Sequence, residues 1–414
     1  MSETAMESDS SGEPRLALRR RLGLPLLVLY GVGITVGAGI YVLIGAVAGH
    51  AGAYSPWAFL LAGIVMAFTV ASYAELSTRF PVSAGEAAYV KAAFNSRLLS
   101  TAIGLSTIAI GVMSASTVTL GSVGYIQQFV DLPRGFLVVT VVVVLGAVAA
   151  WGILESVVIA GLLTLVEVGG LLAIVVAAVH SNLPVAQALT TLPPLEFHVL
   201  SSIAFASLLA FFAFIGFEDL ANIVEEAKNP HRDIPRAMVF TLIISTALYV
   251  IVAAVAISAV SVERLSSSPA PLSLVFREIS GVSPATISAI AIVATLNTIL
   301  AQITMAARVV YGMARQGDLP ATIGAVHPGT ATPWLATALI VAAVVGLALA
   351  FPFVGLAEST SVATLAVFAV VNLALLRLKY RRAPSSAAHV NIPVWTPAAG
   401  LVSCVVMIVA ALSG

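Results

Sequence analysis

Residues 31–40 read GVGITVGAGI, and four of these ten residues are glycine. The stretch lies inside an apolar run from Leu22 to about Ala48, which is long enough to cross a bilayer as a helix. Glycine is among the weakest residues in a helix interior. These glycines have two interpretations: they let neighbouring helices pack closely, or they interrupt the helix and turn backbone groups toward a cavity.

The composition is that of a membrane protein. Of the 414 residues, 60% are hydrophobic and 9% are charged, whereas soluble domains carry about 25% charged residues. The net charge of zero argues against a nucleic-acid partner. Cys404 is the one cysteine, so an intrachain disulfide is excluded. Residues 1–21 are polar and charged and are predicted to be a disordered cytoplasmic tail.

Apolar segments long enough to span a bilayer recur along the whole chain. We count eleven, which predicts an all-α integral membrane protein. The predicted spans are 22–48, 55–78, 98–128, 135–154, 156–180, 199–226, 236–260, 283–314, 333–351, 355–376 and 393–412.

The basic residues test this count. With the N-terminus inside, only three of the nineteen Lys and Arg residues fall outside, namely Arg134, Arg264 and Arg277. Because basic residues favour cytoplasmic loops, this bias supports eleven spans with the N-terminus in the cytoplasm and the C-terminus outside.

A second unusual stretch, FFAFIGFEDLANIVEE at 211–226, lies in the sixth span. Glu218 and Asp219 fall near mid-membrane, where a carboxylate is either functional or held by structural hydrogen bonds. Five spans separate this stretch from the glycine-rich one, and a five-span repeat inserts its second copy upside down. Interrupted helices at matching positions of inverted halves indicate a transporter binding site, so the pairing favours a break at 31–40.

Two other polar features lie inside spans. Glu167, in LLTLVEVGGLL, is either a coupling group that takes up protons or a permanently protonated hydrogen-bond donor. The eighth span carries a polar stripe that serves interhelical hydrogen bonds or supplies oxygen ligands: Thr295, Asn297, Thr298, Gln302 and Thr304. No P-loop, HExxH or CxxC motif occurs, so we expect neither an enzyme nor a bound metal or cofactor.

Four blocks of sequence resemble the amino acid–polyamine–organocation superfamily. They are GVGITVGAGIYVL, ELSTRFPVSAGEAAYV, AFFAFIGFEDLANIVEEAKNPHRDIPRA and ARVVYGMARQGDLP, and the likeness covers about residues 20–380. Bacterial amino-acid permeases and cationic amino-acid transporters are the most similar branch. The resemblance implies a 5+5 inverted-repeat core with broken first and sixth helices. The repeats are expected at 22–180 and 199–378, joined by an outside loop at 181–198, with a link and an eleventh span at 379–414.

The resemblance also implies where substrate and coupling ion bind. The substrate is expected at the two breaks, on Ile34, Thr35, Gly37, Ala38 and Gly39 and on Phe212, Ile215 and Gly216. Phe212 holds the position of an aromatic gate. Proton or cation coupling is expected at Glu167, Glu218 and Thr298.

Two departures from the family pattern matter. Some proton-coupled members carry a lysine where this chain has Glu167, so a fixed ammonium that mimics sodium is missing here. Either Glu167 takes up the proton itself, or a cation binds near it with help from Thr298. The twelfth span of the family is also missing.

We therefore expect a secondary active transporter of amino acids or related amines in the inner membrane, embedded in the lipid bilayer and working by alternating access. Proton-coupled symport is the first expectation. An exchanger or facilitator of the same fold, a sodium-coupled symporter and a solute sensor that does not transport are the alternatives.

Overall fold

The computed structural model describes most of the chain outside the N-terminal tail. The described residues are 6–8, 14–16, 22–81, 85–151, 157–327, 330, 332–381 and 389–413. Most of the predicted tail therefore lies outside the described residues. Its described part is an antiparallel pair of short strands, β1 (Met6–Ser8) and β2 (Pro14–Leu16).

Each of the eleven predicted spans contains at least one helix among the described residues. The first consists of α1 (Leu24–Val36) and α2 (Gly39–Ala51), and the sixth of α9 (Phe197–Phe212) and α10 (Asp219–Asn222). The others are α3 (Ser55–Arg79), α5 (Arg97–Ile126), α6 (Arg134–Trp151), α7 (Val157–His180), α11 (Pro230–Ala259), α14 (Ala285–Arg315), α15 (Trp334–Ala350), α16 (Phe353–Tyr380) and α17 (Trp395–Ser413).

Length and composition agree with this count. Among the described residues, eight stretches are long and apolar enough to cross a membrane, and α2 and α3 count together as one of them. Three shorter apolar helices, α1, α9 and α15, complete the set. The two broken spans thus yield short helices because each is interrupted.

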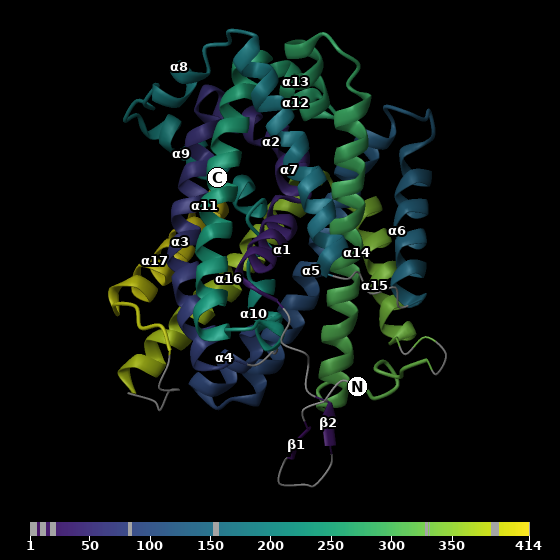
Figure 1. Ribbon diagram of the computed structural model, residues 1–414, viewed down its shortest axis with the longest axis vertical. Coiled ribbons are helices and arrows are strands. Elements are labelled where there is room, and N and C mark those ends of the chain that lie inside the picture. The colour runs from purple at the N-terminus through teal and green to yellow at the C-terminus, as the bar shows by residue number, and fades with distance from the viewer. Residues whose placement is uncertain are drawn as a thin grey trace.

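Short elements cap the two ends of the bundle (Figure 1). The end that holds α4 (Gly85–Phe94) also holds α10 and the two strands, and we name it the α4 end. The opposite, α12 end holds α8 (Val185–Thr190), α12 (Val262–Ser267) and α13 (Pro271–Ser280). Single 3-10 turns lie at Gly52–Tyr54 and Val224–Glu226.

Helix packing follows an inverted repeat. The helix α1 of the first span packs against α7 and α11, the fifth and seventh spans. Its counterpart α9 of the sixth span packs against α16 and α3, the tenth and second spans. These contacts correspond when the first five spans are matched to the next five. The pairs α5–α14, α3–α11 and α6–α15 also pack, and each joins one span to its own counterpart. The predicted 5+5 core with broken first and sixth helices is confirmed.

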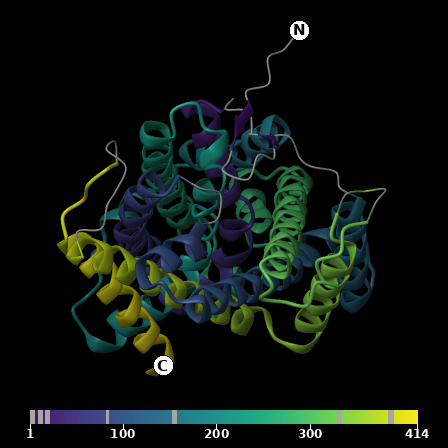
Figure 2. The ribbon, with the colours of Figure 1, turned by 90° about the horizontal axis from the view of Figure 1, so that it is seen from below.

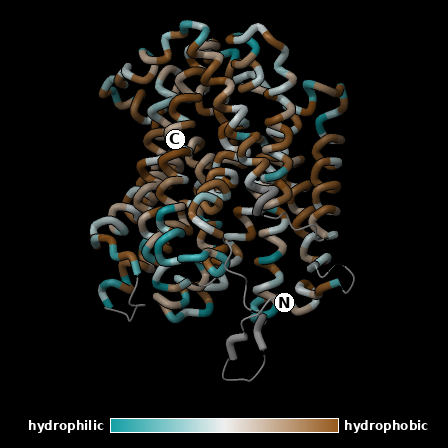
Figure 3. Tube along the Cα trace, in the orientation of Figure 1, coloured by the Kyte–Doolittle hydropathy of each residue, from teal (hydrophilic) through white to brown (hydrophobic). Residues whose placement is uncertain are grey.

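The surface is apolar around the middle and polar at both ends (Figure 3). Exposed side chains such as Ile64, Val144 and Val406 are at least half exposed and lie on outward helix faces. Seen along the bundle, α17 and α6 occupy opposite sides, while α1 lies in the middle (Figure 2). An apolar belt of this kind faces lipid, and the interrupted helices lie deep inside it.

Candidate functional site

The first break lies at Gly37 and Ala38, between α1 and α2. The Gly37 amide still donates to the Gly33 carbonyl oxygen (3.0 Å), and helical bonding resumes where the Val42 amide donates to the Ala38 carbonyl oxygen (3.1 Å). The amides at the start of α2 precede that bond and carry the positive end of the helix dipole; they belong to Gly39, Ile40 and Tyr41. The break therefore offers backbone donors deep inside the protein.

The second break covers residues 213–218, between α9 and α10. Here the backbone first tightens, because the Ile215 amide donates to the carbonyl oxygen of Phe212, three residues back (3.1 Å). Gly216 then adopts a φ of 120°, a conformation that L side chains rarely adopt. Its amide donates to Oε2 of Glu218 (2.8 Å). The carboxyl group of Glu218 thus caps the break rather than pointing away from it.

The two breaks lie against each other. A Cβ atom at Gly39 would come within 2.7 Å of the Ala213 Cβ, so only glycine allows this approach of α2 to the second break. A Cβ atom at Gly216 would lie 3.2 Å from the carbonyl oxygen of Ile34. Both interpretations of the glycines therefore hold: the helix is interrupted at Gly37, and the glycines around it admit neighbouring elements.

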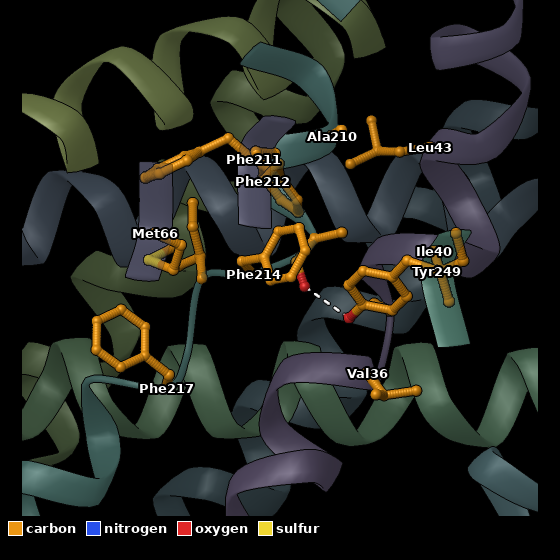
Figure 4. Close-up of a cluster of buried hydrophobic side chains, with 14 of the residues drawn as sticks. Val36, Ile40, Leu43, Met66, Ala210, Phe211, Phe212, Phe214, Phe217 and Tyr249 are labelled. Carbon is orange, nitrogen blue, oxygen red and sulfur yellow. Dashed lines mark hydrogen bonds between the residues drawn. The ribbon is translucent and has the colours of Figure 1, made fainter. Parts of the chain in front are cut away.

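Tyr249 of α11 joins the two breaks. Its hydroxyl lies 2.6 Å from the Thr35 carbonyl oxygen and 2.7 Å from that of Ala213, and it donates its one proton between them. The ring packs edge-on against Phe214, with centroids 5.0 Å apart (Figure 4). Because the residue is fully buried, this single side chain fixes the separation of the two interrupted backbones.

Two further tyrosines hold the start of α2. The Tyr41 hydroxyl donates to the carbonyl oxygen of Glu167 on α7 (2.6 Å), and the Tyr125 hydroxyl of α5 donates to the carbonyl oxygen of Tyr41 (2.6 Å). The Glu167 side chain is itself fully buried. The backbone of Glu167 thus reaches the first break through Tyr41, and its carboxyl group lies in the protein interior.

Hydroxyl groups surround the first break on two sides. On α14, Thr298 lies against Gly37: a Cβ atom there would be 2.6 Å from its Oγ1. Where α1 packs against α11, the buried hydroxyls of Thr35 on α1 and of Thr241 and Ser245 on α11 have no hydrogen-bond partner among the described residues. Buried polar atoms in this state point to water or a ligand that completes them. In the α14 stripe, Thr295 instead donates across to Oγ of Ser122 (3.0 Å), an interhelical bond.

The predicted gate residue, Phe212, is buried at the end of α9 with 4% of its surface exposed. In Figure 4 it lies in one apolar cluster with Val36 and Ile40, which flank the first break. It therefore packs in the apolar core beside the two breaks, and its role as a gate stays a prediction.

Loop helices cover α2 at the α12 end. The carbonyl oxygen of Leu265 lies 2.7 Å from where a Cβ atom at Gly45 would be, and Pro269 lies against Gly124 of α5. Beside this contact is a cavity of about 250 Å³ lined by residues that include Val42, Arg134 and Phe353. The α12 end of α2 is therefore covered by α12.

The structure thus brings the predicted site residues together. Residues 34–39 and 212–216 lie at breaks that touch, Thr298 contacts Gly37, and Glu218 caps the second break. Tyr41, Tyr125 and Tyr249 are not among the site residues predicted from the sequence. Their position inside apolar spans was a signal that could have identified them, because a buried tyrosine hydroxyl needs a hydrogen-bond acceptor.

Comparison with known proteins gives a consistent result. The family model described as amino acid permease matches residues 27–413. The branched-chain amino acid permease BcaP of Bacillus subtilis is 28% identical over 390 residues, which is 90% of this chain and 83% of the relative. An uncharacterized transporter of Mycobacterium tuberculosis is 32% identical over 394 residues, 94% of this chain and 86% of the relative. The vacuolar cationic amino acid transporter 4 of Arabidopsis thaliana is 31% identical over 385 residues, 88% of this chain and 64% of the relative.

Proposed function

The chain belongs to the amino acid permease family, and on that premise we propose that it accumulates amino acids or related amines by alternating access. Membership makes it an amino-acid transporter and a multi-pass membrane protein rather than an enzyme. Uphill movement, the coupling ion and the binding residues are our proposal.

The contact between the two breaks is the observation that carries this function. Gly39 lies against Ala213, Gly216 lies against Ile34, and Tyr249 bonds to both backbones. Backbone that is not helical is tolerated at membrane depth only where protein or a water-filled cavity surrounds it. Two such segments that meet at the centre of an inverted repeat form a substrate site that can be exposed to either side in turn.

The backbone groups favour a zwitterionic substrate. The α-carboxylate binds at Gly37, Ala38 and Gly39, where the start of α2 supplies amide donors and the positive helix end. The carbonyl groups of Ile34 and Thr35 and of the 212–216 segment accept from the α-ammonium. Phe212 then closes over the bound molecule.

Glu167 and Glu218 are the proposed coupling groups. A carboxyl group buried at membrane depth changes its proton occupancy when water reaches it, so exposure to alternate sides drives proton uptake and release. Proton-coupled symport is therefore the first choice. A sodium ion held near Glu167 by oxygen atoms, with Thr298 among them, is the alternative.

The proposed location is the inner membrane, with the N-terminus and the α4 end in the cytoplasm. Only three of the nineteen basic residues, Arg134, Arg264 and Arg277, then lie outside. All three lie at the α12 end of the bundle: Arg134 begins α6, Arg264 is on α12 and Arg277 is on α13.

Uptake by the purified protein in proteoliposomes tests the proposal. Radiolabelled leucine and arginine are offered separately under an inward proton gradient, an inward sodium gradient, and neither. We expect accumulation of at least one of them above its external concentration under the proton gradient.

Each other result names a different function. Accumulation that follows sodium and ignores pH contradicts proton coupling. Exchange without net accumulation under either gradient identifies an exchanger or facilitator. Binding without flux identifies a sensor and contradicts transport.

A further inference from the structure

Three carboxyl groups lie near one another at the α4 end of the second break, two on the adjacent residues Glu218 and Asp219 and the third on α4. Glu86 of α4 is buried, with 9% of its surface exposed, and Glu218 and Asp219 at the start of α10 are partly buried. The Tyr73 hydroxyl of α3 donates to Oε1 of Glu86 (2.9 Å), and the Asn222 amide donates to Oδ1 of Asp219 (3.3 Å). We name Glu86, Glu218 and Asp219 the carboxyl triad.

Packing ties the three groups to one another. Gly85, the neighbour of Glu86, lies against the Asn222 side chain: a Cβ atom there would be 2.7 Å from Asn222 Oδ1. The Tyr73 ring lies edge-on to Phe217, the neighbour of Glu218, with centroids 5.2 Å apart. Tyr73 and Asn222 therefore bridge α4 to the break and to α10.

No cation balances this charge among the described residues. Lys91 is exposed on α4, and Arg377 of α16 lies over the Phe94 ring at 4.8 Å; neither forms an ion pair with the triad. Burial raises the pKa of Glu86 above its usual value. Carboxyl groups that interact without a cation lose their protons one after another rather than together. The described part of the chain also has no cluster of acidic groups in metal-binding geometry.

Tyr89 gives an independent sign that something binds here. It follows Glu86 by three residues, so both side chains leave the same face of α4. Its ring lies edge-on to Tyr73 at 6.1 Å, yet its fully buried hydroxyl has no hydrogen-bond partner among the described residues. Burial and the Glu86 carboxylate both raise its pKa, so the group stays a neutral donor. A buried donor of this kind calls for an acceptor such as a bound water molecule.

We propose that the carboxyl triad, with the Tyr89 hydroxyl and bound water, is a proton-release site of the transport cycle and that Glu86 is one of its proton carriers. This rests on the proposed proton symport and adds Glu86, which no site prediction from the sequence included. A carboxyl O–H bond breaks, the proton passes to water on the α4 side, and the carboxylate remains. Partial exposure of Glu218 and Asp219 gives that water access.

The test compares Glu86→Gln with wild type in proteoliposomes. Glutamine imitates the protonated acid, so substrate counterflow without a gradient persists while accumulation driven by the proton gradient is lost. In wild type, the internal pH of half-maximal exchange reports the triad. Tyr89→Phe removes one donor and shifts that midpoint by about one unit, a ten-fold change in proton affinity.

Glu196→Gln is the matched control, because Glu196 is an exposed carboxyl group outside the triad, beside His198. It leaves accumulation and the pH midpoint unchanged. If wild type couples to protons but Glu86→Gln and Tyr89→Phe keep its accumulation and its pH midpoint, the triad proposal is wrong. If wild type itself ignores the proton gradient, the proposed coupling fails before the triad is tested.

Stability against pH provides a readout that does not need transport. A carboxyl group whose folded pKa is raised stabilises the protein at low pH, and that contribution is lost as pH rises through the folded pKa. Wild-type thermal stability should therefore fall as the pH rises above the usual pKa of a glutamate. We expect this fall to be smaller in Glu86→Gln. An unchanged pH profile in a folded variant contradicts the proposal.

Discussion

Single residues set the geometry of the two breaks. Gly216 combines a φ of 120° with close contact to Ile34, and Tyr249 bonds to the Thr35 and Ala213 carbonyl oxygens. Neither residue needs to contact the substrate to affect transport. Each determines where the backbone groups at the breaks lie, so its loss is expected to weaken substrate binding by moving those groups.

Gly216→Ala is expected to abolish transport. Its backbone cost is about 1–3 kcal/mol, and a methyl group there also collides with Ile34. Gly281→Ala is the matched control, because Gly281 has a φ of 63° but open space around its Cβ position. We expect it to lose about 1–2 kcal/mol of stability and keep transport. Thermal unfolding and uptake measure both; equal loss of transport would contradict a role for the Ile34 contact.

Tyr249→Phe is expected to weaken substrate binding and destabilise the fold. It leaves two buried carbonyl groups without their donor, at a cost of about 1–3 kcal/mol. Tyr380→Phe removes a hydroxyl from an exposed side chain and serves as the control. Substrate-dependent thermal shifts measure both effects, and an unchanged shift in Tyr249→Phe would argue against the positioning role.

Glu167→Gln is expected to abolish accumulation driven by the gradient and spare exchange. Glutamine keeps the size of the side chain but takes up no proton, whereas exchange needs no net proton movement. Counterflow and gradient-driven uptake are measured on the same preparation, with the exposed Glu263→Gln as control. Equal loss of both activities would indicate a structural role for Glu167.

At the scale of elements, polar contacts hold α17 to the core. Glu75 of α3 is fully buried and pairs with Arg79 (2.6 Å) and with Lys379 of α16 (2.7 Å). It also accepts from the Ile392 amide, just before α17 (2.9 Å).

A second polar cluster joins α3 to α16. The Asn372 side chain of α16 forms hydrogen bonds with Ser72 (2.6 Å) and Thr69 (3.1 Å) of α3. These contacts join α3, α16 and the segment before α17 into one unit.

Removal of the central carboxylate tests this unit. Glu75→Gln leaves the buried cations of Arg79 and Lys379 without their carboxylate and is expected to cost about 3–5 kcal/mol. Glu278→Gln on α13 breaks an ion pair with Arg264 that is open to solvent, so we expect little change. Thermal unfolding in detergent compares them. A similar loss in both variants would contradict a special role for burial.

At the scale of the whole molecule, symmetry explains the placement of the site. Because α1 and α9 occupy matching positions in inverted halves, their breaks meet inside the bundle, between the α4 and α12 ends. α12 covers one side, whereas the carboxyl triad lies on the other. An arrangement of this kind allows one half of the bundle to move relative to the other around a fixed site.

Cysteine labelling tests the orientation. The native Cys404 is buried, so a thiol reagent that does not cross membranes leaves the wild type unlabelled. In intact cells we expect Glu263→Cys on α12 to be labelled and Lys91→Cys on α4 to be labelled only after permeabilisation. The reverse pattern would place the N-terminus outside and contradict the orientation drawn from the basic residues.

The sequence by itself determined the membrane class, the eleven spans and the two broken helices. The class and the spans follow from apolar segments of bilayer length and from the distribution of basic residues. The broken helices were predicted from the matching positions of the glycine-rich and carboxylate stretches in inverted halves and from the resemblance to a known family. The predicted residues Gly37, Gly216 and Glu218 lie in the breaks, and Gly39 begins the helix that follows the first of them.

Only the tertiary structure decided which groups from distant spans meet. Tyr249 is far from Thr35 in sequence, and Glu86 lies in a loop helix that polarity alone does not single out. Their roles depend on packing between helices, and hydrophobic periodicity specifies which face is buried but not which partner it meets. The sequence therefore predicted where the interruptions lie, and the fold decided what surrounds them.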